Sequence, residues 1–521
     1  QHLVIAAATR DLIPYISDAV PGWFQAFITL FDPKGKKVGY ADHFRFQQDP
    51  LIEYEVAEDG EYSLEIHDSI YRGREDFVYR ITAGELPFVT DVFPLGGKAG
   101  SKSKLEIKGW NLPVSKLTED NKRKAPGIYP VSVRKGEWTS NQMPFAVDTL
   151  KESSEKEAND RKERAQKIKL PLIVNGRIDK PGDCDVFRFD GRAGQQVVAE
   201  VLARRLDSPL DSVLKLTDAN GKQIAFNDDY EDRGMGLMTF QADSWLSATL
   251  PAKGRYYLYL RDREEKGGPD YAYRLRISAP RPDFELRITP ASINARAGST
   301  VPVTVYAVRR DGFAGDIALK LKDAPSGFSL DGGWIPSGQD QVRLTLTIPP
   351  TRMDQPLALH VEGRANIQGH EVTRPGVPAE NMMQAFAYHH LVPAHDWMVR
   401  VLGSGRYRLD WRLAANKPVK VPAGGTAPVK VTVPLKRLPG PVHLTLNEPP
   451  QGIAIQNISR TKDGVSFLLR ADSAKAKAGL KGNLIVDAFT ERAAKEKEKP
   501  VMRTVPLGTL PAIPFEIVAS R

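Results

Sequence analysis

The chain has 521 residues, a length that suggests about three to five domains of roughly 100–200 residues each. Its 73 basic and 64 acidic residues are interleaved and leave a net charge of +9, without the concentrated basic stripe that is typical of a nucleic-acid-binding protein. A single cysteine, Cys184, excludes an intrachain disulfide, and no apolar run approaches the roughly 18 residues of a membrane-spanning helix.

Apolar and polar residues alternate along most of the chain, which is typical of β-strands buried on one face. Turns rich in Gly, Pro and Asp separate these stretches, and the 42 Gly and 39 Pro are spread along the sequence. We therefore predict an all-β fold, a tandem array of small antiparallel β-sandwich domains of jelly-roll-like and Ig-like type. The alternating stretches are residues 3–7, 62–66, 197–202, 256–260, 301–306, 342–348 and 429–433.

Residues 1–86 and 150–280 repeat the same motifs in the same order, which predicts two similar domains. The second copy continues upstream of Gly194, whereas nothing corresponds to that stretch before Gln1. We therefore expect a truncated first domain, a chain that is a piece of a longer protein, and an exposed sheet edge near Leu3–Ala8. The matching segments are Asp32–Lys36 with Asp218–Lys222, Asp59–Asp68 with Lys253–Asp262, and Asp76–Ile81 with Asp270–Leu275.

Residues 87–149 form a unit of a second kind. An apolar strand that begins at Pro87 leads into a Gly-rich turn, and the strand after that turn ends at Gly109 and Asn111. The Pro-rich strand, the Gly-containing turn and the Gly-x-Asn-Leu strand end resemble the IPT/TIG family of immunoglobulin-like domains. The resemblance implies a small Ig-like sandwich between the two repeats.

The complete second copy contains, in order, the motifs Glu155–Asp160, Asp183–Phe189, Asp218–Gly221, Asn227–Asp229, Gly254–Tyr257 and Asp270–Leu275. This order resembles the bacterial pre-peptidase C-terminal (PPC) domain, a small β-sandwich often placed beside secreted peptidases, which typically has Pro where this chain has Ala158. The resemblance implies a truncated PPC-like sandwich at residues 1–86 and a complete one at residues 150–280. It also implies that the charged residues 151–169, here called the opening segment, form a strand and loop and no free helix.

The remaining residues contain another related pair of segments, because Ala297–Val305 matches Ala423–Val431. Both have the strand–turn–strand pattern of bacterial Ig-like domains, with expected limits of 281–402 and 403–521. The whole order of domains resembles large secreted proteins of planctomycete-type bacteria. That resemblance implies a bacterial protein that is secreted, at the cell surface or periplasmic.

The acidic start of the second copy is the clearest chemical signal. Calcium prefers about six to eight hard oxygen ligands, several of them from carboxylates on a flexible segment. In the related collagen-binding domains of clostridial collagenases a Glu-x-Glu-x-Asn-Asp segment holds calcium; residues 155–160 match it, but the spacing to the later aspartates differs. A polar linker without metal is the alternative reading. The expected calcium ligands are Glu155, Glu157, Asn159, Asp160, Asp183 and Asp185.

Two other polar clusters favour structural roles. Asn227–Asp232 is interpreted as a solvent loop, because Asn and Asp favour turns, with a metal site as the alternative. His389, His390 and His395 could serve zinc, but no partner cysteine or Glu motif accompanies them, so a polar interdomain turn is favoured.

The sequence contains no Gly-x-Ser-x-Gly, no His-Glu-x-x-His and no phosphate-binding Gly loop. We therefore expect no catalytic residues. The expected function is that of a non-catalytic extracellular binding or spacer protein, which contacts extracellular protein or polysaccharide. The first alternative is an accessory C-terminal region of a secreted peptidase whose catalytic domain lies upstream. The second is a hydrolase whose carboxylate or histidine site is recognised only by its geometry.

Overall fold

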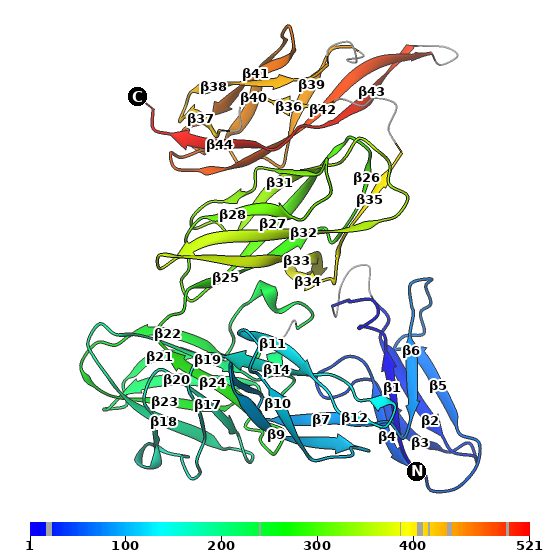
Figure 1. The fold of residues 1–521 in the computed structure, drawn as a ribbon, viewed down its shortest axis with the longest axis vertical. Coiled ribbons are helices and arrows are strands. Elements are labelled where there is room, and N and C mark those ends of the chain that lie inside the picture. Colours follow the sequence, from blue (N-terminus) through cyan, green and yellow to red (C-terminus); the bar gives the residue numbers. More distant parts are fainter. Residues whose placement is uncertain are drawn as a thin grey trace. The chain divides into compact units, whose positions relative to one another are not determined.

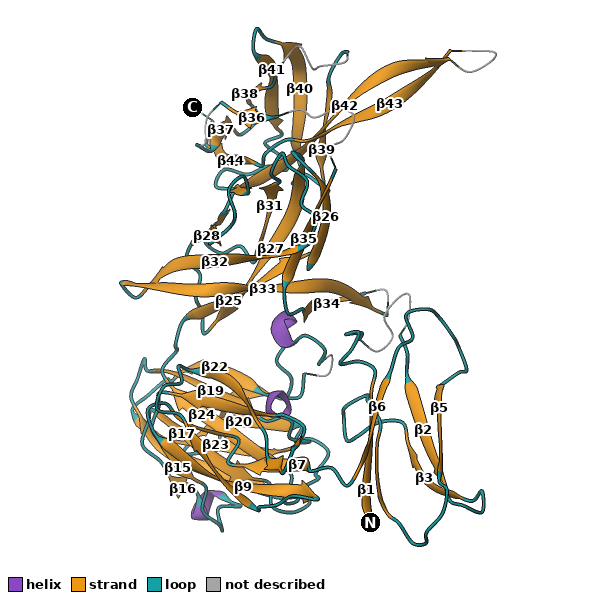
Figure 2. Ribbon diagram, turned by 45° about the vertical axis from the view of Figure 1, so that its right-hand side comes forward, coloured by secondary structure: helices purple, strands orange, loops and turns teal. Residues whose placement is uncertain are grey.

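The computed structural model describes residues 1–16, 23–238, 241–385, 387–403, 410–414, 417–434, 440–495 and 500–520. It divides into two compact units, the first formed by residues 1–281 and 382–390, the second by residues 282–381 and 391–521. The predicted all-β array of small sandwiches is confirmed (Figures 1 and 2). Within the described ranges no helix is long and apolar enough to cross a membrane. The helical turns are η1 (Lys162–Arg164), η2 (Arg204–Leu206) and η3 (Arg233–Met235).

Residues 1–86, the first repeat, form two three-stranded sheets in the orders β4-β1-β6 and β3-β2-β5. Their inner faces meet over a small core that includes Ile5, Ile28 and Leu30. The strands are β1 (His2–Ala8), β2 (Ala26–Phe31), β3 (Lys37–Ala41), β4 (Leu51–Glu55), β5 (Ser63–Asp68) and β6 (Arg80–Gly84).

Residues 87–149 form two further three-stranded sheets, β10-β9-β7 and β11-β14-β8, and a short hairpin of β12 with β13. Their core includes Leu105, Ile107 and Phe145. The strands are β7 (Phe88–Phe93), β8 (Gly96–Lys98), β9 (Lys102–Trp110), β10 (Lys116–Asp120), β11 (Gly127–Val131), β12 (Arg134–Lys135), β13 (Trp138–Thr139) and β14 (Met143–Asp148).

Residues 150–280, the second repeat, form two five-stranded sheets in the orders β15-β17-β24-β19-β22 and β16-β18-β23-β20-β21. Apolar side chains from both sheets, among them Val174, Phe187 and Leu275, fill the space between them. The strands are β15 (Glu152–Ser154), β16 (Gln166–Lys167), β17 (Leu172–Arg177), β18 (Cys184–Gly191), β19 (Gln196–Leu202), β20 (Ser212–Asp218), β21 (Gln223–Asn227), β22 (Trp245–Thr249), β23 (Gly254–Asp262) and β24 (Ala272–Ser278).

The second unit contains the remaining strands, apart from the end of β33 and the start of β34, which belong to the first unit. It has two cores, one that includes Phe284 and Trp397 and one that includes Phe467 and Phe515. The strands after β24 are β25 (Asp283–Thr289), β26 (Ser292–Arg296), β27 (Thr300–Arg310), β28 (Ile317–Lys322), β29 (Ser329–Asp331), β30 (Trp334–Ile335), β31 (Gln341–Thr347), β32 (Leu357–Ile367), β33 (His370–Gln384), β34 (Tyr388–Pro393), β35 (Trp397–Leu402), β36 (Arg412–Leu413), β37 (Val419–Pro422), β38 (Thr426–Thr432), β39 (His443–Asn447), β40 (Ile453–Arg460), β41 (Gly464–Ala471), β42 (Lys481–Lys495), β43 (Pro500–Thr509) and β44 (Ile513–Val518).

The two repeats share their topology. The order β4-β1-β6 of the first matches β22-β19-β24 of the second, and β3-β2-β5 matches β21-β20-β23. Their first shared turn is built in the same way, because Asp32 accepts hydrogen bonds from the backbone N–H groups of Lys34 and Lys36, and Asp218 accepts them from Asn220 and Lys222. Short polar side chains that bond the backbone ahead of them stabilise such turns.

The sheet edge that we expected near Leu3–Ala8 lies elsewhere. Strand β1 is central, since it pairs with β4 on one side and with β6 on the other. On the side where the second repeat has β17 and β18, the last strands in the two sheets of the first repeat are β6 and β5. The prediction was wrong because the first strand in the chain is not the last strand in the sheet: in the second repeat its counterpart β19 is also internal.

The opening segment lies along the edges of both sheets of the second repeat. Its start, β15, pairs in parallel with β17, and its end, β16, pairs in parallel with β18. Between them the chain crosses from one sheet to the other, and its only helical part is the three-residue turn η1. The prediction of a strand and loop in place of a free helix is confirmed.

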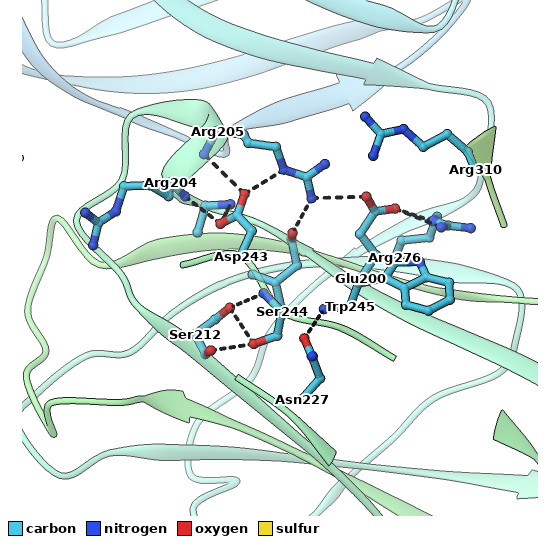
Figure 3. Close-up of polar contacts among 12 residues, drawn as sticks. Glu200, Arg204, Arg205, Ser212, Asn227, Asp243, Ser244, Trp245, Arg276 and Arg310 are labelled. Carbon is cyan, nitrogen blue, oxygen red and sulfur yellow. Dashed lines mark hydrogen bonds and ion pairs between the residues drawn. The ribbon is translucent and has the colours of Figure 1, made fainter. Parts of the chain in front are cut away.

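A buried ionic network joins β19, the turn after it and β24 (Figure 3). Glu200 on β19 accepts hydrogen bonds from Arg205 Nη2 at 3.0 Å and from Arg276 Nε at 2.9 Å. Arg205 Nε also donates to Asp243 at 2.8 Å, and that carboxylate accepts further bonds from backbone N–H groups of η2. The side chains of Glu200 and Arg276 are only 19% and 10% exposed, so each charge depends on its partners more than on water.

Candidate metal centre

The part of the opening segment that crosses between the sheets, residues 155–159 and here called the crossing, is fixed at both ends by backbone hydrogen bonds. The N–H of Glu155 donates to the carbonyl of Asn175 on β17, and the N–H of Val186 on β18 donates to the carbonyl of Asn159; both bonds measure 2.9 Å. The segment therefore joins the two sheets at a fixed position, beside Asn175 of β17 and Val186 of β18. This places side chains of residues 155–159 beside Asp185, which belongs to β18.

Three carboxylates converge at this crossing. One oxygen each of Glu155, Glu157 and Asp185 lies within 4.8 Å of the others. Glu155 Oε1 accepts a bond from Asn159 Nδ2 at 3.1 Å, and Glu157 Oε2 accepts one from the Asn159 N–H at 3.2 Å. Asp185 Oδ2 accepts a bond of 2.7 Å from the hydroxyl of Tyr273 on β24. Residues from the crossing and from both sheets thus meet at one point.

Two buried oxygens at this point accept no hydrogen bond from any residue that the structure describes. They are Oδ1 of Asp185 and Oδ1 of Asn159, and both residues are 0% exposed. An unpaired polar atom that is buried away from water costs free energy of the order of 1–3 kcal/mol, and more when it carries charge. A cation bound among these oxygens would give both of them a partner, so the residues present fit a metal ion.

The charges at the site oppose one another in the absence of a cation. Burial, and then the neighbouring Glu155, raise the pKa of Asp185 well above its ordinary value. Burial and Glu155 also raise the pKa of Glu157. Burial and the charge of Asp185 raise the pKa of Tyr273, so its hydroxyl stays protonated and donates. Either a proton or a metal ion must therefore relieve the repulsion between these carboxylates.

The structure places the six sequence-predicted ligands in different surroundings. Glu155, Glu157 and Asp185 converge, and Asn159 lies beside them. Asp160 is outside the converging set; its side chain is 43% exposed and lies near Arg161. Asp183 is not among the converging carboxylates either; its Oδ2 accepts the backbone N–H of Asp179 in the turn before β18.

Two residues of the site were missed by the sequence reasoning. Tyr273 lies 88 residues away from Asp185 in the chain, and nothing local links them. Gly176 lies inside β17, and a Cβ at that position would stand 2.3 Å from the Tyr273 hydroxyl and 2.5 Å from Glu155 Oε2. An isolated glycine within a strand often marks such a close approach, so this signal was present in the sequence.

Replacing Gly176 with alanine is expected to disrupt the site, because the new methyl group must displace Glu155 or Tyr273. We expect the Gly176→Ala variant to bind calcium at least about tenfold more weakly than the wild type. A tenfold change corresponds to about 1.4 kcal/mol of binding free energy. Gly254→Ala is the matched control, since a Cβ there would meet no heavy atom within 4 Å. Calorimetric titration of the two variants compares them, and equal affinities would place the ion elsewhere.

The other polar clusters have structural roles in the part of the chain that the structure describes. Asn227 Oδ1 accepts the Trp245 N–H, and Asp232 accepts the Gly234 N–H at the start of η3. His390 Nε2 lies 2.9 Å from the side-chain oxygen of Gln384. Among the described residues, the crossing holds the one set of at least three His, Cys, Asp or Glu side chains whose ligand atoms converge.

Comparison with known proteins gives partial similarities. No protein-family model matches the chain. A stretch of 80 residues is 42% identical to a probable subtilase-type serine protease from Deinococcus radiodurans and covers 15% of this chain and 10% of that protein. The pre-peptidase C-terminal domain of a collagenase from Bacillus anthracis is 18% identical, with 23% of this chain and 100% of that structure covered and a TM-score of 0.18.

A second solved structure, the N-terminal eight Ig domains of the Down syndrome cell adhesion molecule, is 12% identical. It covers 93% of this chain and 64% of that structure, with a TM-score of 0.13. The match to the subtilase-type serine protease spans about a tenth of the length of that protein.

Proposed function

We propose that this chain is a non-catalytic extracellular binding or spacer region in which a calcium ion fastens the opening segment of the second repeat to its sandwich. The observation that carries the proposal is the pair of unpartnered buried oxygens, on Asp185 and Asn159, within a group of converging carboxylates. Because these groups come from the crossing and from β18, an ion held there joins the crossing to the sheet.

The donor set favours calcium over other metals. Its atoms are carboxylate and amide oxygens, the hard ligands that calcium prefers, and water would complete the coordination. Zinc sites are usually built from His nitrogen and Cys sulfur, and neither residue type belongs to this group. Magnesium demands a smaller and more regular octahedron than residues on a crossing loop readily supply.

Calcium binding near neutral pH is expected to release a proton. The pKa of Asp185 is raised by burial and by Glu155, so the metal-free carboxyl holds a proton that must leave before both oxygens can face a cation. Titration calorimetry of calcium in two buffers of different ionisation enthalpy at pH 7 measures this release. Identical heats in both buffers would contradict it, and Asp185→Asn removes the titrating group.

A binding or spacing role is supported by the modular sheets, which occupy most of the described chain. The single thiol is poorly suited to nucleophilic chemistry, because burial raises the pKa of Cys184 to about 11. We expect the purified chain to be retained on insoluble proteins or polysaccharides without degrading them. Pull-downs on cellulose, chitin and collagen, with product assays on the same polymers, test this. Turnover that a single carboxylate or histidine substitution abolishes would contradict the proposal.

A second candidate function is an accessory region of a secreted peptidase. The similarity of 80 residues to a probable subtilase-type serine protease favours it. If the gene's full product is a peptidase, deletion of residues 1–521 is expected to reduce its activity on insoluble protein while activity on a short soluble peptide stays the same. A gene product without peptidase activity would leave the binding or spacer role as the better account.

A further inference from the structure

One sheet of the second repeat has an outer face that points away from the core. In the sheet β16-β18-β23-β20-β21, Phe187, Leu214 and Leu258 face inward and belong to the core. Side chains alternate along each strand, so the residues between these positions point outward. Ala165 of the opening segment covers part of the outer face, where it packs on Tyr257. The rest, here called the basic face, consists of Lys167, Arg188, Lys215, Phe226, Tyr259 and Arg261.

The backbone pairing sets these side chains next to one another. Tyr259 of β23 lies opposite Lys215 of β20, which lies opposite Phe226 of β21. Directly opposite residues share a face of a sheet, on strands about 4.8 Å apart. On the same face, the row on one side of Tyr259 contains Arg261, and the row on the other side contains Arg188. Successive rows are about 6.6 Å apart along a strand, so the groups form one continuous array.

Neighbouring acids do not neutralise the cations of the basic face. The side chains of Lys167, Arg188 and Arg261 form no ion pair and no hydrogen bond with any residue that the structure describes. Nε of Arg188 is buried without an acceptor. Two acids border the face, Asp190 near the end of β18 and Glu163 on η1, and the cations outnumber them. An anion beside the planar Arg188 guanidinium would give this group the partner that it lacks.

Two aromatic rings flank Lys215. Its ammonium lies 4.7 Å from the centroid of the Tyr259 ring, and on its other side Phe226 is 48% exposed. The first repeat does not share this arrangement, because Thr29 and Glu65 stand at the positions of Lys215 and Tyr259. The basic face is therefore a property of the second repeat and does not follow from the fold that the two repeats share.

The arrangement of charges and rings fits an anionic polysaccharide. Cations attract the carboxylate or sulfate groups of such a polymer, and an arginine binds them through two parallel hydrogen bonds. Exposed rings supply apolar surface for the faces of sugar rings. The cations belong to four different strands, so one ligand reaches several of them only if it is a polymer. The grooves of duplex DNA admit a helix or a two-stranded ribbon, and a sheet of five strands is broader than either.

We propose that the basic face of the second repeat binds an anionic polysaccharide. Arg188, Lys215 and Arg261 contact its acidic groups, and Phe226 contacts a sugar ring. The proposal rests on the extracellular binding role proposed above, and it names the class of polymer and the surface that serve this role. Because exposed charges carry the attraction, the affinity should fall as the salt concentration rises.

The test is affinity electrophoresis of the full chain in gels that contain polygalacturonate, dextran sulfate or uncharged dextran. Both anionic polymers are expected to retard the wild type, and dextran is not. The double variant Arg188→Gln, Arg261→Gln should bind about tenfold more weakly or worse, because it removes two unpaired charges. The matched control is Arg192→Gln, Lys253→Gln, which removes two exposed charges from turns outside the face and should bind as the wild type does. Melting curves of both double variants should stay cooperative.

A third variant separates sugar recognition from simple charge attraction. Phe226→Ala keeps every charge and should still weaken binding of both anionic polymers. An unchanged affinity in Phe226→Ala, equal affinities of the two double variants, or tighter binding of single-stranded DNA than of either polymer would overturn the proposal. Retention of the wild type by cellulose, chitin or collagen without binding of an anionic polymer would overturn this proposal alone. No retention on any polymer would contradict the proposed binding role as well.

Discussion

Calcium at a hundredfold excess over its dissociation constant is expected to raise the free energy of unfolding of the second repeat by about 2.7 kcal/mol, because the ion binds the folded state alone. In the unfolded chain Asp185 lies far from Glu155 and Glu157 in sequence, so the site exists only after folding. Differential scanning calorimetry of the full chain in chelator and in millimolar calcium measures the shift. One transition should move to a higher temperature, and the others should stay.

Substitutions at neighbouring positions separate a specific site from general charge screening. Asp185→Asn and Glu157→Gln should each abolish most of the calcium-dependent shift, because they remove a converging carboxylate. Asp160→Asn removes the same charge from a side chain that is 43% exposed and outside the group, so its shift should match the wild type. A loss of the shift in Asp160→Asn but not in Asp185→Asn would show that the opening segment binds calcium in another arrangement.

The Glu200→Gln variant is expected to destabilise the second repeat by about 3 kcal/mol. Removing one partner of a largely buried ion pair leaves the other charge uncompensated, which typically costs about 3–5 kcal/mol. The lower end applies here, because Arg205 keeps its bond to Asp243. Urea denaturation compares the variant with Glu163→Gln, an exposed glutamate of η1 whose change should stay within about 0.5 kcal/mol. A Glu200→Gln variant as stable as that control would contradict the role of the network.

Acid should remove the contribution of Glu200. Burial alone would raise the pKa of this carboxyl, but Arg205 and Arg276 outweigh it and hold the pKa at about 2, below the ordinary value of 4.5. A carboxyl whose pKa is lowered in the folded state contributes to the free energy of unfolding. This contribution is fully present above the unfolded-state pKa and is lost as the pH falls through the folded-state pKa. The difference in stability between wild type and Glu200→Gln should therefore shrink between pH 4.5 and pH 2.

The strands were predictable from sequence, whereas their order in the sheets was not. Residues 197–202 and 256–260 were predicted to form strands, and β19 and β23 lie there. The pattern that predicts a strand is local and does not name the neighbouring strand. The misplaced edge at β1 arose for this reason: the residues of β1 pair with residues of β4 that lie 45–53 positions away and with residues of β6 that lie 72–80 positions away, and such distant partners give no local signal.

The candidate site was predictable to the extent that its residues lie close together in the sequence. Glu155, Glu157 and Asn159 fall within five residues, and the structure brings all three beside Asp185. The sequence did not separate them from Asp160, because the chain bends at Glu157 and at Asp160 and so does not follow the simple alternation of faces of a strand. Asp185 belongs to the site and Asp183 does not, because β18 begins between them, at Cys184. Two aspartates spaced by two in the sequence do not specify where that strand begins.

The most direct test of a calcium ion at the crossing is isothermal titration of calcium into the chelator-treated full chain, with Asp185→Asn titrated in parallel. The wild type is expected to bind one ion per chain at the crossing, and Asp185→Asn is expected to lose that binding event while its metal-free melting curve stays cooperative. No heat of binding in the wild type, or an unchanged titration in Asp185→Asn, would contradict a metal centre built from Glu155, Glu157, Asn159 and Asp185.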